Sequence, residues 1–361
     1  MMISWGNNLA YQQELLEICN TDLPFDILKN QKILITGANG MICSYLVDVL
    51  MEANLQKNLN LQITALVRSE EKGRARFEKY LESQSFLLLV GDVCQSEVFE
   101  NNLWDYIIHG AGNAHPIAFA TQPVETMTSN FLGSANLLNY ALSKKSVAEV
   151  KKILFLSTGE VYGHAAIEQE TGWKESDYGM IDSMDIRSCY PESKRAAETL
   201  FRSYEKEYNI HSVIVRLAYI YGATITKDNS RADAQFLRNA VIGEDILMKS
   251  TGSQFRSYCY LQDAACAILI ALLIGISGEA YNVANKESNL TILQYAKQLA
   301  ATFGVNIRME LPETVEKEGY SKMKQEILDA SKLEKLGWKP QNNINQGLQK
   351  IKNILIDEGN L

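Results

Sequence analysis

The chain has 361 residues, enough for roughly two domains. Hydrophobic residues make up 46% of it and charged residues 22%, a composition that favours a globular protein and argues against a disordered or low-complexity one. The formal net charge of −8 argues against a nucleic-acid or anionic-membrane surface, because both require an excess of Lys and Arg.

The beginning of the chain is polar and predicts an amphipathic helix around Leu9 to Ile18, without the apolar core of a signal peptide. The most apolar run, Ala264 to Ile276, is too short to span a bilayer and predicts a core helix. Six cysteines without a Cys-x-x-Cys pair fit a reducing compartment, so we expect a cytoplasmic protein. Because the four histidines lack ligand-like spacing, we expect no metal site.

Apolar strands that alternate with helical stretches indicate a doubly wound α/β fold. The first strand, Lys32 to Thr36, leads through a glycine turn into a helix from Met41 to Asn54. This alternation favours parallel pairing through right-handed crossovers, with helices on both faces of the sheet. Further strands are predicted at Gln62–Val67, Phe86–Val90, Asp105–His109, Ile153–Ser157 and Ser212–Leu217.

The chain divides by pattern into an extension and two interleaved parts. Residues 1–30 are expected to form an N-terminal helical extension, and residues 31–218 a dinucleotide-binding domain of the Rossmann type. From about Tyr219 the pattern loosens, so residues 219–361 are expected to be mainly a smaller substrate-binding domain, with residues of about 255–285 returning to the first. The later elements expected there are a strand at Ala280–Ala284 and a final helix at about Asn345–Ile356.

The segment TGANGMIC, residues 36–43, lies between the first strand and the first helix of the dinucleotide-binding part. Backbone amides and the helix dipole at such a turn hold a pyrophosphate, and Gly37 and Gly40 permit the tight turn and the close approach. Cys43 replaces the usual third small residue, a mild departure because Cys is small and apolar. The expected NAD(P)-binding residues are Gly37, Asn39, Gly40, Met41, Ile42, Arg68, Asp92, Val93, Ala111, Tyr190 and Lys194.

The end of the second strand bears on the choice between NAD and NADP. An acidic residue there binds the ribose hydroxyl of NAD, but the segment from Ala65 to Ser69 contains none. Arg68 favours a 2′-phosphate and hence NADP, with a solvated surface arginine as the alternative.

Tyr190 and Lys194 lie four residues apart on a predicted helix and share one face. An ammonium group beside a phenol favours the phenolate, so Lys194 is expected to lower the pKa of Tyr190 and make it a base. Thr158 begins a segment after the fifth strand, where doubly wound sheets bind ligands, and is expected to hydrogen-bond the same substrate oxygen. Tyr320 and Lys324 have the same spacing and are interpreted as a solvated helix face.

The motifs TGANGMI, DYIIHGAG, STGEVYG and YPESK, in this order, resemble the extended short-chain dehydrogenase family of nucleotide-sugar epimerases, dehydratases and decarboxylases. The resemblance covers roughly residues 31–290 and looks most like the UDP-glucuronate decarboxylase branch. It implies NAD as the default cofactor, a nucleotide-diphosphate sugar as the substrate, and a homodimer paired through helices such as Pro191–Tyr208. The segments that carry the branch resemblance are His109–Pro116, with Pro123 and Asn130 downstream, Arg187–Glu198 and Gly252–Asp263.

The resemblance implies that hydride leaves the sugar C4 for the nicotinamide while Tyr190 takes the hydroxyl proton, and that reduction by the same cofactor closes the cycle. Glu160 matches the carboxylate that handles the C5 proton in dehydratases and decarboxylases, a general acid/base role; its alternative is a solvated loop carboxylate. The neighbouring position, Asp in dehydratases and Ser in decarboxylases, is Gly159 here, which weakens a dehydratase interpretation.

Arg256 matches the arginine that meets the pyrophosphate or sugar in the family and is expected to clamp a diphosphate, with a structural salt bridge as the alternative. Tyr219 stands where the family commonly has an Asn that touches substrate, so the substrate need not be UDP-glucuronate. The expected substrate-binding residues are His115, Arg187, Tyr219, Arg231, Lys249 and Arg256.

These observations leave three functions open. A redox-neutral decarboxylase, epimerase or dehydratase is favoured by Glu160. An NADPH-dependent reductase of a nucleotide-linked keto-sugar or ketose is favoured by Arg68 and by the departures at Gly159 and Tyr219. A non-catalytic dinucleotide-binding sensor is expected to have lost the catalytic Tyr or Lys, and the chain retains both.

Overall fold

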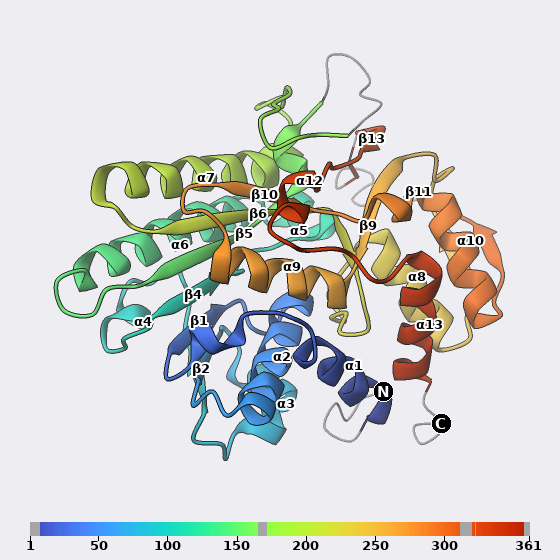
Figure 1. Cartoon of the computed structure of the whole chain (residues 1–361). Coiled ribbons are helices and arrows are strands. Elements are labelled where there is room, and N and C mark those ends of the chain that lie inside the picture. The colour runs from blue at the N-terminus through green and yellow to red at the C-terminus, as the bar shows by residue number, and fades with distance from the viewer. Residues whose placement is uncertain (1–7, 165–171, 311–319, 322, 357–361) are drawn as a thin grey trace.

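A seven-stranded parallel sheet forms the centre of the computed structural model, which describes residues 8–164, 172–310, 320–321 and 323–356 (Figure 1). The strand order is β3-β2-β1-β4-β5-β6-β10, so the connections change direction beside β1, at the point where such sheets bind ligands. The strands are β1 (Lys32–Thr36), β2 (Gln62–Val67), β3 (Phe86–Val90), β4 (Tyr106–His109), β5 (Lys152–Thr158), β6 (Ser212–Leu217) and β10 (Ala280–Val283).

Helices cover both faces of this sheet. Ile33 and Ile35 of β1 join the core under α2 (Met41–Lys57) and α9 (Leu261–Ile274), whereas Leu34 joins the core under α6 (Pro123–Lys144) and α7 (Cys189–Tyr208). This alternation follows from the two-residue period of a strand, and it explains why the strands are apolar on both faces. Shorter helices between the strands are α3 (Glu70–Phe77), α4 (Glu97–Glu100), α5 (Pro116–Thr121), and the 3₁₀ turns η2 (Glu78–Tyr80), η3 (Gly159–Tyr162) and η4 (Ile186–Ser188).

A second, mixed sheet is built around β9 (Phe255–Tyr260). It lies beside the carboxyl edge of the large sheet, and its helices α8 and α10 form the right side of Figure 1. The other strands are β7 (Tyr219–Tyr221), β11 (Asn289–Thr291) and β13 (Gln325–Glu326) in this sheet, and the separate pair β8 (Ile246–Met248) and β12 (Ile307–Met309). The helices are α8 (Ala232–Val241), α10 (Ile292–Phe303), α12 (Ser331–Glu334), α13 (Ile344–Leu355) and the turn η5 (Lys286–Ser288).

The N-terminal helix α1 (Leu9–Cys19) packs against α2, α9 and α13, so the first and last described helices lie side by side (Figure 1). Glu14 of α1 is buried, and it accepts hydrogen bonds from Tyr45 at 2.7 Å and from Tyr260 at 2.5 Å. The turn η1 (Phe25–Leu28) then leads into β1. Within the described residues, no helix combines the length and apolarity that crossing a membrane requires.

The doubly wound sheet is confirmed, and the strands predicted from sequence agree with it to within one residue at either end. The return of the chain to the large sheet begins with α9, because β9 belongs to the second sheet. The prediction that Tyr320 and Lys324 share a helix face is wrong: both lie in irregular chain that leads into β13. Residues 1–7, 311–319 and 357–361, which fall in the predicted outer parts, are outside the described residues.

Candidate active site

A cavity of about 360 Å³ opens at the carboxyl ends of β1, β4, β5 and β6. Residues of the second sheet and of α8 form its opposite wall. The predicted site residues that line it are Gly37, Gly40, Met41, Ile42, His115, Thr158, Glu160, Arg187, Tyr190, Lys194, Tyr219, Arg231, Lys249 and Arg256. The remaining predicted residues, Asn39, Arg68, Asp92, Val93 and Ala111, do not line it.

The turn after β1 has the backbone that a phosphate cradle needs. Gly37 has a φ of +67°, and a Cβ there would stand 2.7 Å from the carbonyl oxygen of Gly110. Gly40 is the N-cap of α2 and offers no side chain to the first-turn amides, which therefore remain for a ligand. Asn39 Oδ1 is buried without a hydrogen-bond partner among the described residues. These residues fit the pyrophosphate of a dinucleotide.

Thr36 and His109 connect this turn to the residues that follow β4 through hydrogen bonds. No motif in the sequence predicts this role. Thr36 Oγ1 lies 2.8 Å from His109 Nδ1 and accepts hydrogen bonds from the amides of Gly110 and Ala111 at 3.2 Å. Burial lowers the pKa of His109 to about 3, so the imidazole is neutral at physiological pH. The neutral imidazole can hydrogen-bond the Thr36 hydroxyl, and this bond connects the end of β1 to β4.

The residues expected around the adenosine end make contacts of their own. Arg68 pairs with Glu125 of α6 at 2.5 Å, and both side chains are about half exposed. Asp92 accepts a hydrogen bond from the Cys94 amide at 2.8 Å, and Val93 is buried in the core beneath α6. Arg68 is thus engaged with a carboxylate on the protein surface.

Tyr190 lies on the first turn of α7 with its ring stacked on Phe119, the ring centroids 4.5 Å apart. Burial and the neighbouring Glu160 raise the pKa of Tyr190, whereas a hydrogen bond with Thr158 lowers it. The shift is opposite to the predicted one. Lys194 Nζ donates to the Leu156 carbonyl at 2.7 Å, and burial lowers the pKa of Lys194 to about 8.

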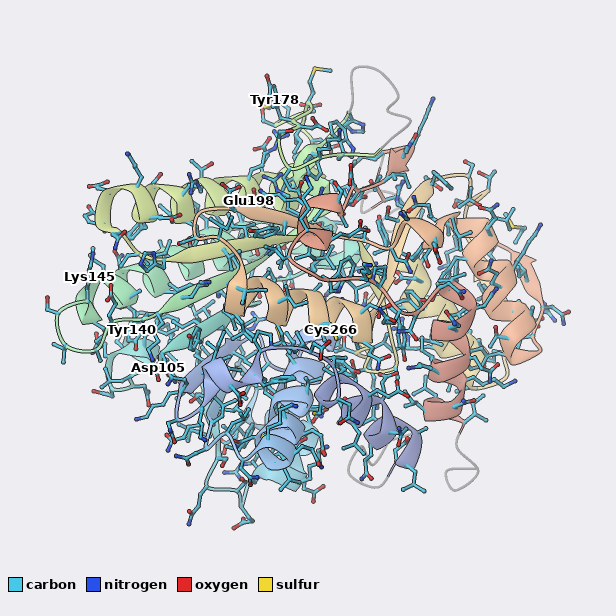
Figure 2. The ribbon with its side chains drawn as sticks, in the orientation of Figure 1. Asp105, Tyr140, Lys145, Tyr178, Glu198 and Cys266 are labelled. Atoms are coloured by element: carbon cyan, nitrogen blue, oxygen red, sulfur yellow. The ribbon has the colours of Figure 1, made fainter. Side chains whose placement is uncertain are left out.

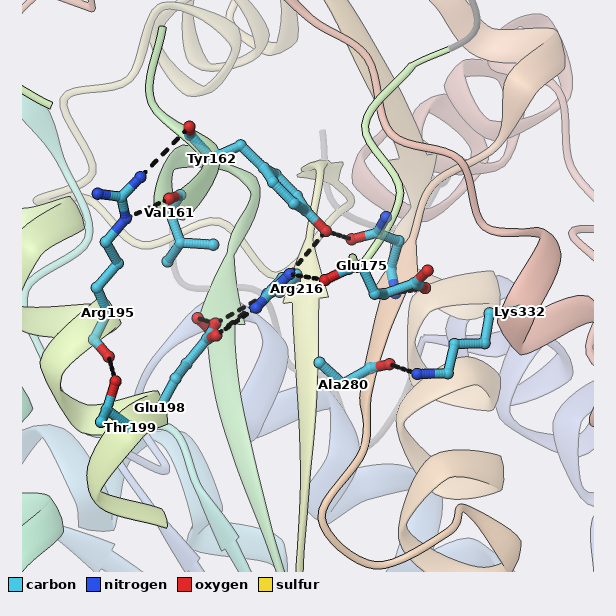
Figure 3. Close-up of polar contacts among 11 residues, drawn as sticks. Val161, Tyr162, Glu175, Arg195, Glu198, Thr199, Arg216, Ala280 and Lys332 are labelled. Carbon is cyan, nitrogen blue, oxygen red and sulfur yellow. Dashed lines mark hydrogen bonds and ion pairs between the residues drawn. The ribbon is translucent and has the colours of Figure 1, made fainter. Parts of the chain in front are cut away.

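A buried carboxylate connects the elements that carry these groups. Glu198, one turn after Lys194 on α7, accepts a hydrogen bond from Ser157 Oγ at 2.5 Å. It also pairs with Arg216 of β6 at 2.7 Å, as Figure 3 shows. Ser157 directly precedes Thr158. The carboxylate of Glu198 therefore ties together the end of β5, β6 and the helix that carries Tyr190 and Lys194.

Glu160 is held by an arginine that was predicted to bind substrate. The Arg187 nitrogens Nη1 and Nη2 donate to the two oxygens of Glu160 at 2.6 and 2.9 Å, a bidentate pair. Burial raises the pKa of Glu160, but Arg187 outweighs burial and leaves the pKa below its ordinary value. The side chain lines the cavity as an anion, so the solvated-loop alternative does not describe it.

Two more arginines stack over Tyr219, with the guanidinium carbons of Arg231 and Arg256 at 4.6 and 5.5 Å from the ring centroid. Arg231 pairs with Asp233 at 3.2 Å, while its Nη2 is buried without a hydrogen-bond partner in the described chain. Arg256 is fully buried, and its Nη1 and Nη2 donate to the carbonyls of Phe255 and Met323. Arg231 is therefore better placed than Arg256 to receive an anionic group.

The other predicted substrate residues lie at the cavity wall. His115 Nδ1 is 3.1 Å from Ser230 Oγ, and burial lowers the pKa of His115. Lys249 follows β8 and contributes to the wall on the side of the second sheet. Among the residues the structure describes, no cluster of His, Cys, Asp or Glu is suited to a metal ion.

Sequence reasoning missed several residues of the cavity, above all Glu326 of β13. Tyr320, interpreted from sequence as solvated, also lines it. Asn113 Nδ2 and Gln254 Oε1 are buried at its wall without partners among the described residues, which leaves them available to a ligand. Glu326 follows no motif, and a strand of two residues gives no periodicity from which to find it.

Comparisons with known proteins identify the family of this chain. Residues 33–284 match the model of the NAD dependent epimerase/dehydratase family. UDP-glucuronic acid decarboxylase 3 of Arabidopsis thaliana is 32% identical over 320 residues, which cover 88% of this chain and 87% of that protein.

Solved structures share the fold. A UDP-glucuronic acid 4-epimerase from Bacillus cereus has a TM-score of 0.74 at 21% identity, covering 91% of this chain and 99% of the other. A dTDP-glucose 4,6-dehydratase from Streptomyces venezuelae has a TM-score of 0.77 at 22% identity, with 91% and 98% covered. The chain belongs to the NAD dependent epimerase/dehydratase family.

Proposed function

We propose that this protein is a redox-neutral enzyme that converts a sugar carried on a nucleotide diphosphate through a transient 4-keto sugar. The observation that carries the proposal is the convergence of Thr158, Tyr190 and an ionised Glu160 on one cavity that begins at a glycine phosphate cradle. Oxidation and reduction of the sugar require Thr158 and Tyr190, whereas a carboxylate beside them serves a step that follows the oxidation.

Each residue has a distinct task in this scheme. Tyr190, as the phenolate, takes the proton of the C4 hydroxyl, and Thr158 hydrogen-bonds the same oxygen as it becomes a ketone. The positive charge of a bound nicotinamide would have to lower the pKa of Tyr190, which burial and Glu160 raise in its absence. Gly37 and Gly40 would hold the pyrophosphate of the dinucleotide, whose nicotinamide would supply reversible hydride-transfer chemistry to this cavity. Glu160, kept ionised and oriented by Arg187, acts on the sugar once C4 is a ketone: it takes the C5 proton in an epimerase or dehydratase, and in a decarboxylase, where the bond to the carboxylate breaks instead, it accepts a hydrogen bond from a sugar hydroxyl and orients the sugar for that step.

We propose a nucleotide-linked hexuronate as the substrate and decarboxylation as its fate. Support comes from relatives named UDP-glucuronic acid decarboxylases and from the unpaired Nη2 of Arg231, which suits a carboxylate or a phosphate. NAD is the proposed cofactor, because the Arg68–Glu125 pair would have to break to admit a 2′-phosphate. The Arg68–Glu125 pair weakens one of the observations that favour the reductase alternative, whereas the departures at Gly159 and Tyr219 remain.

The test is an assay of the purified protein with UDP-glucuronate and NAD. The proposal predicts release of CO₂ and a UDP-pentose, without net formation of NADH and with loss of both products in Tyr190→Phe. Consumption of NADPH in step with product, or no turnover of any nucleotide sugar, would contradict it.

We also propose a homodimer and a cytoplasmic location. The outer face of α6 exposes Val124, Met127 and Phe131, which lie three and four residues apart on one stripe, and Val124 is 77% exposed. Of the apolar residues of α7 expected at the interface, Ala197 and Phe201 are buried in the protein's own core, whereas Ala196 is exposed and Leu200 is half-buried. All six cysteines are free thiols, which suits a reducing compartment.

A further inference from the structure

Glu326 is a buried carboxylic acid that the scheme above does not use. It lies on β13, paired in register with Arg256 of β9, and is 2% exposed at the wall of the cavity. Its Oε2 has no hydrogen-bond partner among the described residues and stands 3.8 Å from Arg256 Nε, which also has none. Such an atom beside a cavity is available to a ligand.

The absence of a side chain at Gly159 lets this carboxyl group reach the catalytic turn. A Cβ built on Gly159 would lie 2.8 Å from Glu326 Oε1 and 3.2 Å from both terminal methyls of Leu328. Glu326 therefore fills the space next to Glu160 that a side chain at position 159 would take. Two carboxyl groups from distant parts of the sequence thus meet beside the substrate cavity.

The carboxyl groups of Glu160 and Glu326 differ in their protonation state. Arg187 binds both oxygens of Glu160 and keeps it ionised. Burial, followed by repulsion from Glu160, raises the pKa of Glu326 to about 7, because Arg256 compensates the charge only in part. Below about pH 7 the pair holds one proton, which resides mainly on Glu326, and this proton is lost as pH rises through about 7.

We propose that Glu326 is a catalytic acid of this cavity, which donates its proton to the substrate after the C4 hydroxyl has been oxidised. The inference rests on the proposed function. In the decarboxylation, the bond between C5 and the carboxylate breaks and CO₂ leaves, so the electron pair passes into the 4-keto enolate. The proton of Glu326 forms the new C–H bond at C5, and Glu326 remains as a carboxylate until water reprotonates it.

The test replaces the acid with an amide of the same shape. Glu326→Gln is expected to lower kcat by at least about 100-fold, the usual contribution of a general acid, while oxidation of the substrate persists and bound NADH absorbance rises. The wild-type rate is expected to fall as pH rises through about 7, because Glu326 loses its proton there, and the variant is expected to lack this limb.

A matched control is Glu175→Gln. Burial also raises the pKa of Glu175, but this residue does not line the cavity, and its Oε1 accepts one hydrogen bond from the Asn282 amide, which a Gln oxygen also accepts. The control is expected to keep the wild-type rate and pH profile. A Glu326→Gln enzyme with wild-type kcat, or with the alkaline limb unchanged, would overturn the proposal.

A second variant displaces the acid without removing it. Gly159→Ala places a methyl group 2.8 Å from Glu326 Oε1 and 3.2 Å from the Leu328 methyls, so the Glu326 side chain has to shift and kcat is expected to fall about 10-fold. A thermal melt of each variant separates this loss of kcat from misfolding. An unchanged kcat in this variant counts against the acid role. Because wild-type turnover of the nucleotide sugar is measured in the same assay, failure of the proposed function is seen separately, as an inactive wild type.

Discussion

Tyr190 is enclosed on one side by the ring of Phe119 and contacts Thr158 on the other. Replacement by Phe keeps the stacked ring and removes only the hydroxyl. We therefore expect Tyr190→Phe to lower kcat by about 1,000-fold or more with an unchanged melting temperature, as judged by steady-state kinetics and thermal unfolding. Lys194→Met is expected to be equally inactive. A Tyr190→Phe enzyme at near wild-type rate would contradict the mechanism.

The control for this variant needs a tyrosine outside the cavity. Tyr320 stands four residues before Lys324, as Tyr190 does before Lys194, but it lines the cavity and is therefore unsuitable as a control. Tyr178 is 89% exposed and projects from the top of the molecule in Figure 2, away from the sheet. Tyr178→Phe is expected to leave kcat and stability unchanged.

Glu160 combines a catalytic and a structural role, and a single substitution disturbs both. Glu160→Gln leaves the Arg187 charge buried without its carboxylate, which is expected to cost about 3 kcal/mol of unfolding free energy. It is also expected to stall the reaction after oxidation, so that bound NADH absorbance accumulates.

The double variant Glu160→Gln/Arg187→Gln separates these effects. Removal of the unpaired charge is expected to restore most of the stability, measured by chemical unfolding, while the stall persists because the carboxylate is still missing. Full activity in either variant would exclude Glu160 from the chemistry.

At the scale of the elements, the large sheet is predictable because each strand is a short apolar run between turn residues and helices, from Lys32–Thr36 to Ser212–Leu217. The phosphate cradle is equally visible, since its glycines sit directly between a strand and a helix. The pairing of Arg187 with Glu160 and the arrival of Glu326 are not predictable in this way. They depend on long-range packing that brings η4 and β13 to the end of β5, and neither leaves a local pattern.

The turn between β1 and α2 offers a matched pair of glycine variants. Gly37→Ala places a methyl group 2.7 Å from the Gly110 carbonyl oxygen at a φ of +67°, so we expect a lower melting temperature and at least about 100-fold weaker NAD binding. Gly304 ends α10 with a φ of +77° and open space around its Cβ position. Gly304→Ala is expected to cost only about 1 kcal/mol of stability and to bind NAD normally by fluorescence titration.

For the whole molecule, the exposed apolar stripe on α6 predicts association of two copies. Light scattering is expected to give the mass of a dimer, and Met127→Glu with Phe131→Glu is expected to give a monomer that still melts cooperatively. Lys145, labelled at the left of Figure 2, follows the opposite end of α6 from the stripe, so Lys145→Glu serves as a charge control that is expected to leave the mass unchanged. A monomer at all concentrations in the wild type would contradict the proposed homodimer.

The proposed reaction is redox-neutral and passes through a ketone at C4 of the sugar. The most direct measurement uses a nucleotide sugar that carries deuterium at C4 and follows the label by mass spectrometry over many turnovers per molecule of NAD. If the same cofactor returns the hydride, the product is expected to retain the deuterium at C4, and no NADH is expected to accumulate in the wild type. Product that has lost the deuterium, or product formed only in proportion to added NADH or NADPH, would contradict it.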